Sequence, residues 1–330
     1  MAKNEMVDIT EYERLKQENE MLKAQNVACL GDGQVFVKRS QGGIIRAIKG
    51  QVLLEERNGE IATIQGKTMV TSKGFAKANQ LAGLSIITPD RMLSGEGKFI
   101  TNPYPILDEQ SQTVTKILVK KMAVGYSPIG NLVISTATLM YDIKMYFVQD
   151  LVNKVHSNKA AGRISMFNSI TEEDRKKGDF FRIEGDLGVF VDFSNPDILQ
   201  ALKTFMQKKT FGERNAQSIC ERLVFSKHPA LAHIAYVNPS GQDKNQTAKV
   251  TIFGYVFEVS KEELDHIKNA AEKGEEISVK GREIQTVDVG VVSATSEEMV
   301  VETDDEEIAH QSAETADRPD ILKGEGLFGQ

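Results

Sequence analysis

The residue types that carry most enzyme chemistry do not form recognisable groups in this chain. It has five histidines and two cysteines in 330 residues. His228 and His233 stand five residues apart across Pro229, which breaks the helical face that two zinc ligands would share. The sequence has no Gly-x-Ser-x-Gly motif and no Cys/His pairing typical of a nucleophilic enzyme. We therefore predict no catalytic residue, no metal and no cofactor.

A glycine-rich stretch and a group of acids are weaker candidates for chemistry. Residues 94–99 (Ser-Gly-Glu-Gly-Lys-Phe) are similar to part of a phosphate-binding loop, but position 92 is Met where that motif requires Gly. Phe99 also replaces the Ser or Thr that would hold magnesium, so we expect a turn. Three acids near an expected strand would be the ligands of a metal-dependent nuclease, or else ordinary surface groups: Glu184, Asp186 and Asp192.

The most informative pattern is basic. From Asn195 to Ala235 six Lys and Arg residues stand against three acids, an excess of 6 − 3 = +3. Arg214, Ser218 and Arg222 recur every four residues, which aligns them on one face of an expected helix, with Gln217 beside them. Such a row offers guanidinium and small polar groups to successive phosphates. The alternative is a solvated helix face.

Further charges flank this helix. Lys208 and Lys209 precede it, followed by Phe211, whose ring would stack beside the charge. A second cluster occupies an expected strand over 113–124, and it consists of Lys116, Lys120 and Lys121. On charge clustering alone, we assign supporting nucleic-acid contacts to Lys208, Lys209, Lys120 and Lys121.

Net charge does not exclude a nucleic-acid partner, because the acidic residues are concentrated at one end. The chain has 40 Lys and Arg against 47 Asp and Glu, a formal charge of −7. Residues 293–330 hold eleven acids and two bases, or 2 − 11 = −9, which leaves +2 for residues 1–292. We expect a disordered acidic tail. It would add solubility, dock a partner protein through an apolar pair near its end, or compete with nucleic acid for the basic face.

Composition places the rest of the chain among soluble globular proteins. Hydrophobic residues make up 40% of it, enough for a sizeable core. The two cysteines, Cys29 and Cys220, suit a reducing compartment. No apolar run approaches the roughly 18 residues of a membrane span, and the N-terminus is too charged for a signal peptide. We expect a cytoplasmic protein with no membrane contact.

The expected elements indicate an α+β fold, an antiparallel sheet with packed helices. A helix over 9–26 carries a coiled-coil spacing, and it either joins copies into a homo-oligomer or docks on its own domain. Asn58-Gly59 between two β-rich runs predicts a hairpin over 51–65. Further helices are expected over 73–82, after Asn195, over 213–226 and after Ser260, with a final short hairpin over 278–289. Residues 88–109 and 157–178 are expected to be loops. We divide the chain into a helical arm (1–27), a core (28–292) and the tail (293–330).

Two segments resemble a known family. Residues 73–90, with Ala-Asn-Gln-Leu-Ala-Gly-Leu at 78–84, look like the early helix-to-loop segment of phage single-strand annealing proteins of the RecT and lambda Red-beta type. Residues 213–225, Glu-Arg-Asn-Ala-Gln-Ser-Ile-Cys-Glu-Arg-Leu-Val-Phe, are similar to the later basic helix of those proteins. The order of elements along the chain agrees, while residues 97–193 form a long insert relative to that family.

This resemblance implies an oligomeric ring or filament that binds single-stranded DNA and anneals complementary strands without ATP. It assigns phosphate contacts to Arg214 and Arg222 on the matched helix. Two alternatives remain open at the level of sequence. One is a self-assembling structural or regulatory protein, indicated by the N-terminal heptads. The other is a metal-dependent nuclease built on the three acids.

Overall fold

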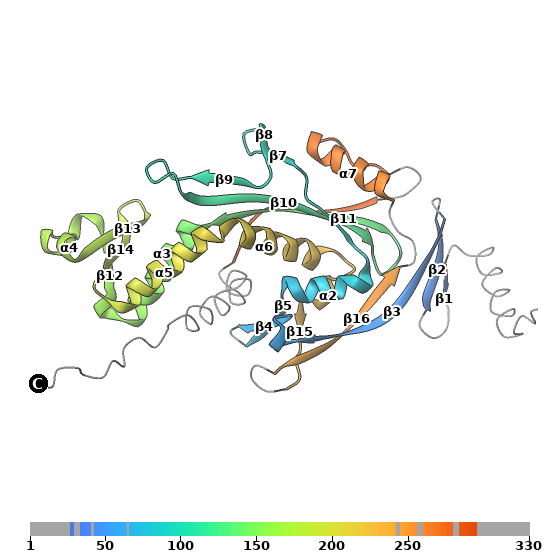
Figure 1. The fold of residues 1–330 in the computed structure, drawn as a ribbon, viewed down its shortest axis with the longest axis horizontal. Helices are drawn as coiled ribbons and strands as arrows, with labels where there is room; N and C mark the ends of the chain where they lie inside the picture. Colours follow the sequence, from blue (N-terminus) through green and yellow to red (C-terminus); the bar gives the residue numbers. More distant parts are fainter. Residues whose placement is uncertain are drawn as a thin grey trace, which may run out of the picture.

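The computed structural model describes most of the chain between its two ends. The described residues are 27–29, 34–40, 43–64, 66–241, 245–255, 260–279 and 284–295. The expected helix over 9–26 lies outside them, and so does the tail expected over 293–330 beyond Thr295. Ser293 ends the last strand and Ala294 is buried, so the predicted start of the tail at residue 293 was too early. The described residues form several sheets with packed helices, so the predicted α+β class is confirmed (Figure 1).

A five-stranded sheet lies at the centre of the molecule. Its strands are β6 (Ser85–Ile87), β9 (Tyr104–Leu107), β10 (Val114–Tyr126), β11 (Leu132–Asp142) and β17 (Ile284–Ser293). The order is β17-β11-β10-β6, and β9 also pairs with β10. The pairings of β10 are antiparallel, whereas β17 runs parallel to β11. The strand predicted over 113–124 is confirmed as part of β10.

Two helices cover opposite faces of this sheet. They are α6 (Gly212–Lys227) and α7 (Lys261–Lys273), which Figure 1 shows below and above β10 and β11. Successive side chains of a strand point to opposite faces. Ile117 and Val119 accordingly pack with Ile219 of α6, while Met122 packs with Ile267 of α7. Both helices were predicted, α7 from the capping box of its N-terminus.

A second layer packs against the C-terminal half of α6. It contains the sheet β1-β2-β3-β16, the small sheet β15-β5-β4 and helix α2. Their bounds are Val27–Cys29 (β1), Gln34–Ser40 (β2), Gly43–Glu55 (β3), Ile61–Ile64 (β4), Lys67–Val70 (β5), Ser72–Ala82 (α2), Tyr236–Val237 (β15) and Thr247–Tyr255 (β16). The rings of Phe75 in α2 and Phe225 in α6 stack with centroids 5.9 Å apart. The early and late parts of the core are therefore joined by one hydrophobic cluster that includes Phe225 of α6.

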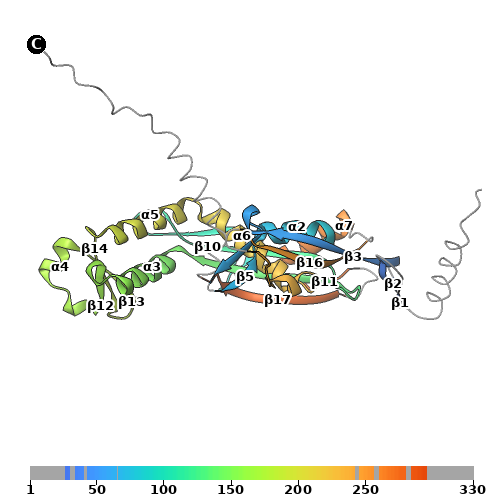
Figure 2. The same ribbon diagram turned by 90° about the horizontal axis from the view of Figure 1, so that it is seen from below.

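Residues 143–211 project from one end of the central sheet (Figures 1 and 2). We call them the arm, and they are distinct from the helical arm expected over 1–27. They comprise α3 (Ile143–Ser157), η2 (Lys159–Ala161), β12 (Gly162–Met166), η3 (Phe167–Ser169), α4 (Glu172–Lys177), β13 (Gly178–Glu184), β14 (Leu187–Asp192) and α5 (Pro196–Thr210). The arm has its own hydrophobic cluster, in which Leu151 of α3 and Ala201 of α5 enclose Val189 of β14. Asn195 caps α5 through the backbone N–H of Asp197, as its sequence indicated.

Two expected loops contain regular structure. Residues 88–109 include β9 and a two-stranded hairpin of β7 (Arg91–Leu93) and β8 (Phe99–Thr101). Residues 157–178 include β12 and α4. Both predictions were wrong because these elements have only three to six residues each, too few to show a clear period.

The hairpin predicted over 51–65 is also wrong. β3 pairs with β2 and β16, and β4 pairs with β5, so the two runs flanking Asn58-Gly59 are not partners. The 3₁₀ turn η1 (Glu56–Asn58) separates them, and Gly59 ends it with φ of 68°. That left-handed conformation is the one glycine adopts at low cost, so the Asn-Gly pair ends a turn and does not join two paired strands.

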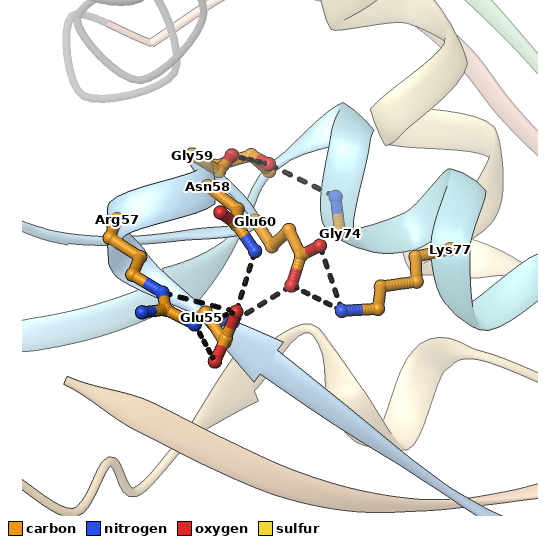
Figure 3. A network of polar contacts seen from close by, with 8 residues as sticks. Glu55, Arg57, Asn58, Gly59, Glu60, Gly74 and Lys77 are labelled. Carbon is orange, nitrogen blue, oxygen red and sulfur yellow. Dashed lines mark hydrogen bonds and ion pairs between the residues drawn. The ribbon is translucent and has the colours of Figure 1, made fainter. Parts of the chain in front are cut away.

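Polar contacts around a buried carboxylate explain this turn (Figure 3). Glu60 is 9% exposed, and its oxygens accept from the backbone N–H of Glu55 at 2.8 Å and from the Lys77 ammonium of α2 at 2.8 Å. Thr71 links the same turn to the start of α2, because its hydroxyl donates to the carbonyl of Gly59 at 2.6 Å and accepts from the N–H of Gly74 at 3.1 Å. These bonds hold the turn against the helix.

The final hairpin expected over 278–289 is not found among the described residues, and its residues 280–283 lie outside them. The described residues from 284 onward form one strand, β17, whose only pairing among them is the parallel one with β11. A register shift interrupts that pairing between Thr136 and Thr138 of β11, and Gly290 of β17 has φ of 68°. The glycine therefore marks a bulge inside the strand and not its end.

Thr71→Ala removes the two hydrogen bonds of the Thr71 hydroxyl, one to the carbonyl of Gly59 and one from the N–H of Gly74 at the start of α2. We expect the free energy of unfolding to fall by about 0.5–2 kcal/mol, because one N–H of the first helical turn no longer has its acceptor. Urea unfolding measures the change. Thr71→Ser retains the hydroxyl and is the matched control, and an alanine variant as stable as the serine variant would contradict the assignment.

The stability of the fold should also depend on the protonation of His228. Its side chain is fully buried, with Nε2 3.3 Å from the carbonyl of Val133 and Nδ1 accepting from the N–H of Ala230 at 3.2 Å. Burial lowers its pKa to about 4, since the charged ring would lose its hydration. The unfolded chain thus takes up this proton at higher pH than the folded one.

The contribution of His228 to the free energy of unfolding is therefore fully present above about pH 6.5. It is lost progressively as pH falls toward 4, by about 3 kcal/mol in all. Unfolding in urea at a series of pH values measures this slope. His228→Gln should flatten the slope between pH 6.5 and 4. A variant with the full wild-type slope would show that other groups cause it.

Candidate functional site

An open groove of about 490 Å³ lies where the arm joins the central sheet. Its walls come from the end of α5, one face of α6 and one residue of β10. The lining residues are Lys121, Thr210, Phe211, Glu213, Arg214, Gln217, Ser218 and Glu221. Four of the eight residues predicted from sequence to contact nucleic acid are therefore brought together here: Lys121, Arg214, Gln217 and Ser218.

The geometry of α6 places most of this lining. Arg214, Gln217, Ser218 and Glu221 stand at i, i+3, i+4 and i+7, so they share one face of the helix. The opposite face, which includes Ile219, is buried against the central sheet. Because packing fixes that face, the polar face is held in a defined position relative to β10.

Arg214 is stacked on an aromatic ring. Its Cζ atom lies 4.7 Å from the centroid of Phe211, the residue that joins α5 to α6. A guanidinium over an aromatic ring is restrained, and guanidinium groups are the side-chain groups that form bidentate bonds to phosphate. Phe211 was predicted to supply a ring beside the charge, and the structure places it there.

Lys121 enters the groove from the other side. Its ammonium is bonded to the Glu221 carboxylate at 2.6 Å, and its side chain is only 8% exposed. Gln217 donates to Glu213 at 3.3 Å. The two cations of the lining are thus matched by two acids. The charge balance within the groove is zero, and any attraction for an anion comes from residues around it.

Two lysines at the end of α5 supply this attraction. Lys209 lies at the rim, bonded to the Thr113 hydroxyl at 2.6 Å, with its ammonium 4.9 Å from the centroid of the Phe205 ring. Lys208 is half-buried beside it on α5. Asp108 lies near Lys209, whose charge is one of the causes that lower the pKa of this acid. With the lining, the two lysines and Asp108 counted together, four cations stand against three acids, an excess of 4 − 3 = +1.

Arg222 does not fit its predicted role. It is 4% exposed and donates from Nε to the carbonyl of Val70 at 2.9 Å, with Nη2 3.6 Å from Met69 Sδ. Each residue advances about 100° around a helix, so position 222 lies about 80° from Arg214 and meets β5. Arg222 is therefore a buried anchor between α6 and β5, and we remove it from the expected phosphate contacts.

Lys120 and Lys121 point to opposite faces of β10. Lys121 is in the groove, whereas Lys120 lies on the face away from α6. The Asn102 side chain bonds both backbone groups of Lys120, at 2.8 and 2.9 Å, and so occupies the strand edge at this point. The structure therefore does not bring Lys120 into the groove.

The acids proposed for a nuclease do not gather into a site. Asp192 accepts from the N–H and hydroxyl of Ser194, and these bonds hold its pKa below the usual range. Asp186 pairs with Arg182 at 3.6 Å, and Glu184 is exposed on β13. The part of the chain that the structure describes holds no group of three metal-ligating side chains. The nuclease hypothesis has no support in this geometry.

Two further features lack the character of a catalytic site. Cys220 lies under the groove, where burial raises the pKa of its thiol to about 12, so it is not a nucleophile at neutral pH. Residues 94–98 connect β7 to β8 as a mostly exposed turn, in agreement with the expectation from sequence, and Phe99 begins β8.

Comparisons of this chain with protein-family models, curated proteins and solved structures found no match. Within the described residues, no helix combines the length and apolar character needed to cross a membrane.

Sequence reasoning missed how the two basic clusters combine. Lys121 and Glu221 are 100 positions apart, and their contact depends on the docking of α6 on β10. Alternation along β10, with Ile117 and Val119 facing the helix, would have separated Lys121 from Lys120. Thr210 and Glu213 carried no signal of their own.

Arg222→Ala should destabilise the fold. We expect the free energy of unfolding to fall by about 1–3 kcal/mol, because the carbonyl of Val70 is left without its buried donor. Arg214→Ala, on the exposed face of the same helix, should stay within about 0.5 kcal/mol of the wild type. Equal urea midpoints for the two variants would contradict the anchoring role of Arg222.

Proposed function

We propose that the protein binds single-stranded DNA in the groove at the α5–α6 junction and anneals complementary strands without ATP. The observation that carries this proposal is the stacked Arg214–Phe211 pair beside Ser218, Gln217 and the lysines of the rim. A cation, an aromatic ring and small polar donors in one open groove are the groups that hold a flexible single strand.

The charged and polar side chains of the groove suit the phosphate backbone of a nucleotide, and the Phe211 ring suits a base that stacks on it. The guanidinium of Arg214 and the ammonium of Lys209 neutralise phosphates and release counterions. Ser218 and Gln217 add neutral hydrogen bonds, which fix a backbone without reading its sequence. The groove is open, so bases on the outer side of the strand remain accessible to a complementary strand. No step in this mechanism needs nucleotide hydrolysis.

The resemblance of residues 73–90 and 213–225 to phage single-strand annealing proteins favours the same function. These residues correspond closely to α2 with its following turn and to α6, the two helices joined by the Phe75–Phe225 stack. We further propose that the protein acts as a homo-oligomer, because annealing along a strand requires several adjacent binding sites. The coiled-coil spacing over 9–26 supports this part of the proposal.

Arg214→Ala should weaken binding to a labelled single-stranded oligonucleotide roughly tenfold at low salt, because the variant cannot form a charge-assisted hydrogen bond to phosphate. The plot of log affinity against log salt should also become shallower. Its slope should change by about 0.7, the value for one phosphate neutralised on a single strand. Fluorescence polarisation across a salt series measures both the affinity and the slope.

Arg91→Ala is the matched control for this experiment. It removes an exposed arginine from β7, outside the groove, and should leave the affinity nearly unchanged. Two results would contradict the proposal: absence of single-strand binding by the wild type, or an equal decrease of affinity in the two variants.

A further inference from the structure

One face of α5 is exposed and carries large apolar side chains. Leu199 and Met206 are 52% and 61% exposed, and Lys203 and Thr210 lie on the same face. These four residues stand at i, i+4, i+7 and i+11, so they form a continuous stripe about 16 Å long. We call this set the α5 stripe.

The α5 stripe leads directly into the groove. Thr210 belongs to both, and Phe211 and Arg214 follow within one helical turn. Figure 2 shows α5 and α6 following one another along the molecule from the arm to the central sheet. A ligand that lies on the stripe therefore meets the cations of the groove.

The combination of groups points to a peptide and not to more DNA. A nucleic-acid backbone would pair with Lys203, Lys209 and Arg214. Because that backbone is charged and polar, it would not cover the apolar side chains of Leu199 and Met206. An acidic peptide that also carries large apolar residues would satisfy both. Methionine in particular is common on surfaces that bind apolar peptide side chains.

The chain itself contains such a peptide. Residues 296–330 carry eleven acids against Arg318 and Lys323. Apolar pairs occur near the end of this segment, at Ile321-Leu322 and Leu327-Phe328. Its charge is therefore opposite to that of the groove and rim, and its apolar pairs match the stripe.

The described chain ends close to the arm. Ala294 is buried, and its carbonyl accepts a hydrogen bond from the hydroxyl of Tyr146 in the first turn of α3. The 35 residues that follow Thr295 could span up to about 115 Å if fully extended. α5 is about 22 Å long, so the whole stripe is within reach of this segment.

We infer that the C-terminal segment of the chain docks on the α5 stripe and occupies the groove in competition with single-stranded DNA. Leu327 and Phe328 would cover Leu199 and Met206, and the acids would pair with the groove cations. The competition with DNA rests on the proposed function, whereas the docking of the segment on the stripe does not. Because the segment is tethered, its effective concentration is in the millimolar range, so a weak contact is enough.

A double-mutant cycle in the full-length chain tests this contact. One variant changes the segment (Leu327→Ser with Phe328→Ser), the second changes the stripe (Leu199→Ser with Met206→Ser), and the third combines them. Each of the first two should raise single-strand affinity about threefold or more. The combined variant should bind no more tightly than either, because both remove one interaction. Ile129→Ser, at an exposed turn, should have no effect.

The inference would be overturned if the two sets of changes had additive effects, or if the segment variant had no effect. A decrease of affinity in the stripe variant would also overturn it and would assign the stripe to DNA. A second measurement needs no DNA. With Met206→p-benzoylphenylalanine, irradiation of the full-length protein should cross-link position 206 to residues 296–330 of the same chain. Cross-links only elsewhere would reject docking. If the cross-link forms and no variant binds DNA, the proposed function fails while the docking stands.

Discussion

Helix α6 lies against the paired strands β10 and β11, and this single packing contact determines the site. Ala216, Ile219 and Leu223 of the helix meet Val119 and Leu139 of the strands. Each large aliphatic side chain among them contributes about 1.5–3 kcal/mol when fully buried. With one face of the helix fixed in this way, its opposite edge must present Arg214, Gln217 and Ser218 above Lys121. The groove is therefore a consequence of core packing.

The junction between α5 and α6 applies a second constraint. A Cβ atom at Gly212 would lie 2.9 Å from Ile143 Cδ1 and 3.2 Å from Ile117 Cδ1, so glycine allows the helix start to approach the sheet this closely. This contact brings Phe211 beside Arg214 and fixes the base of the arm at the groove. The charges that line the groove sum to zero, so under the proposed function the attraction for a strand comes from residues around the groove and should weaken as salt concentration rises.

Local signals in the sequence predicted local structure. The helices expected over 73–82, after Asn195 and after Ser260 are α2, α5 and α7, and each begins with a side-chain cap. Each of these signals concerns a hydrogen bond within the first turn of its helix, and that bond is present in the structure.

Predictions failed where distant contacts decided the outcome. Asn58-Gly59 is a good hairpin turn, but the buried Glu60 and its bond to Lys77 use the turn differently. β17 pairs in parallel with a strand about 150 residues earlier, which no local pattern reveals. Arg222 shares a four-residue spacing with Arg214, yet its contact with Val70 makes it part of the core. The groove was predicted only in part for the same reason. The pattern of the helix predicted that Arg214, Gln217 and Ser218 share a face, whereas Lys121 is brought beside them only by the fold.

Photochemical cross-linking with an oligonucleotide that contains 5-bromodeoxyuridine tests most directly whether the groove holds a single strand. Irradiation of the complex, followed by mass spectrometry of its peptides, identifies the side chains in contact with bases. The account predicts cross-links at Phe211 and its neighbours on α6, and competition by unlabelled single-stranded DNA. Cross-links confined to other surfaces, such as the hairpin of β7 and β8 or the far end of the arm, would contradict it.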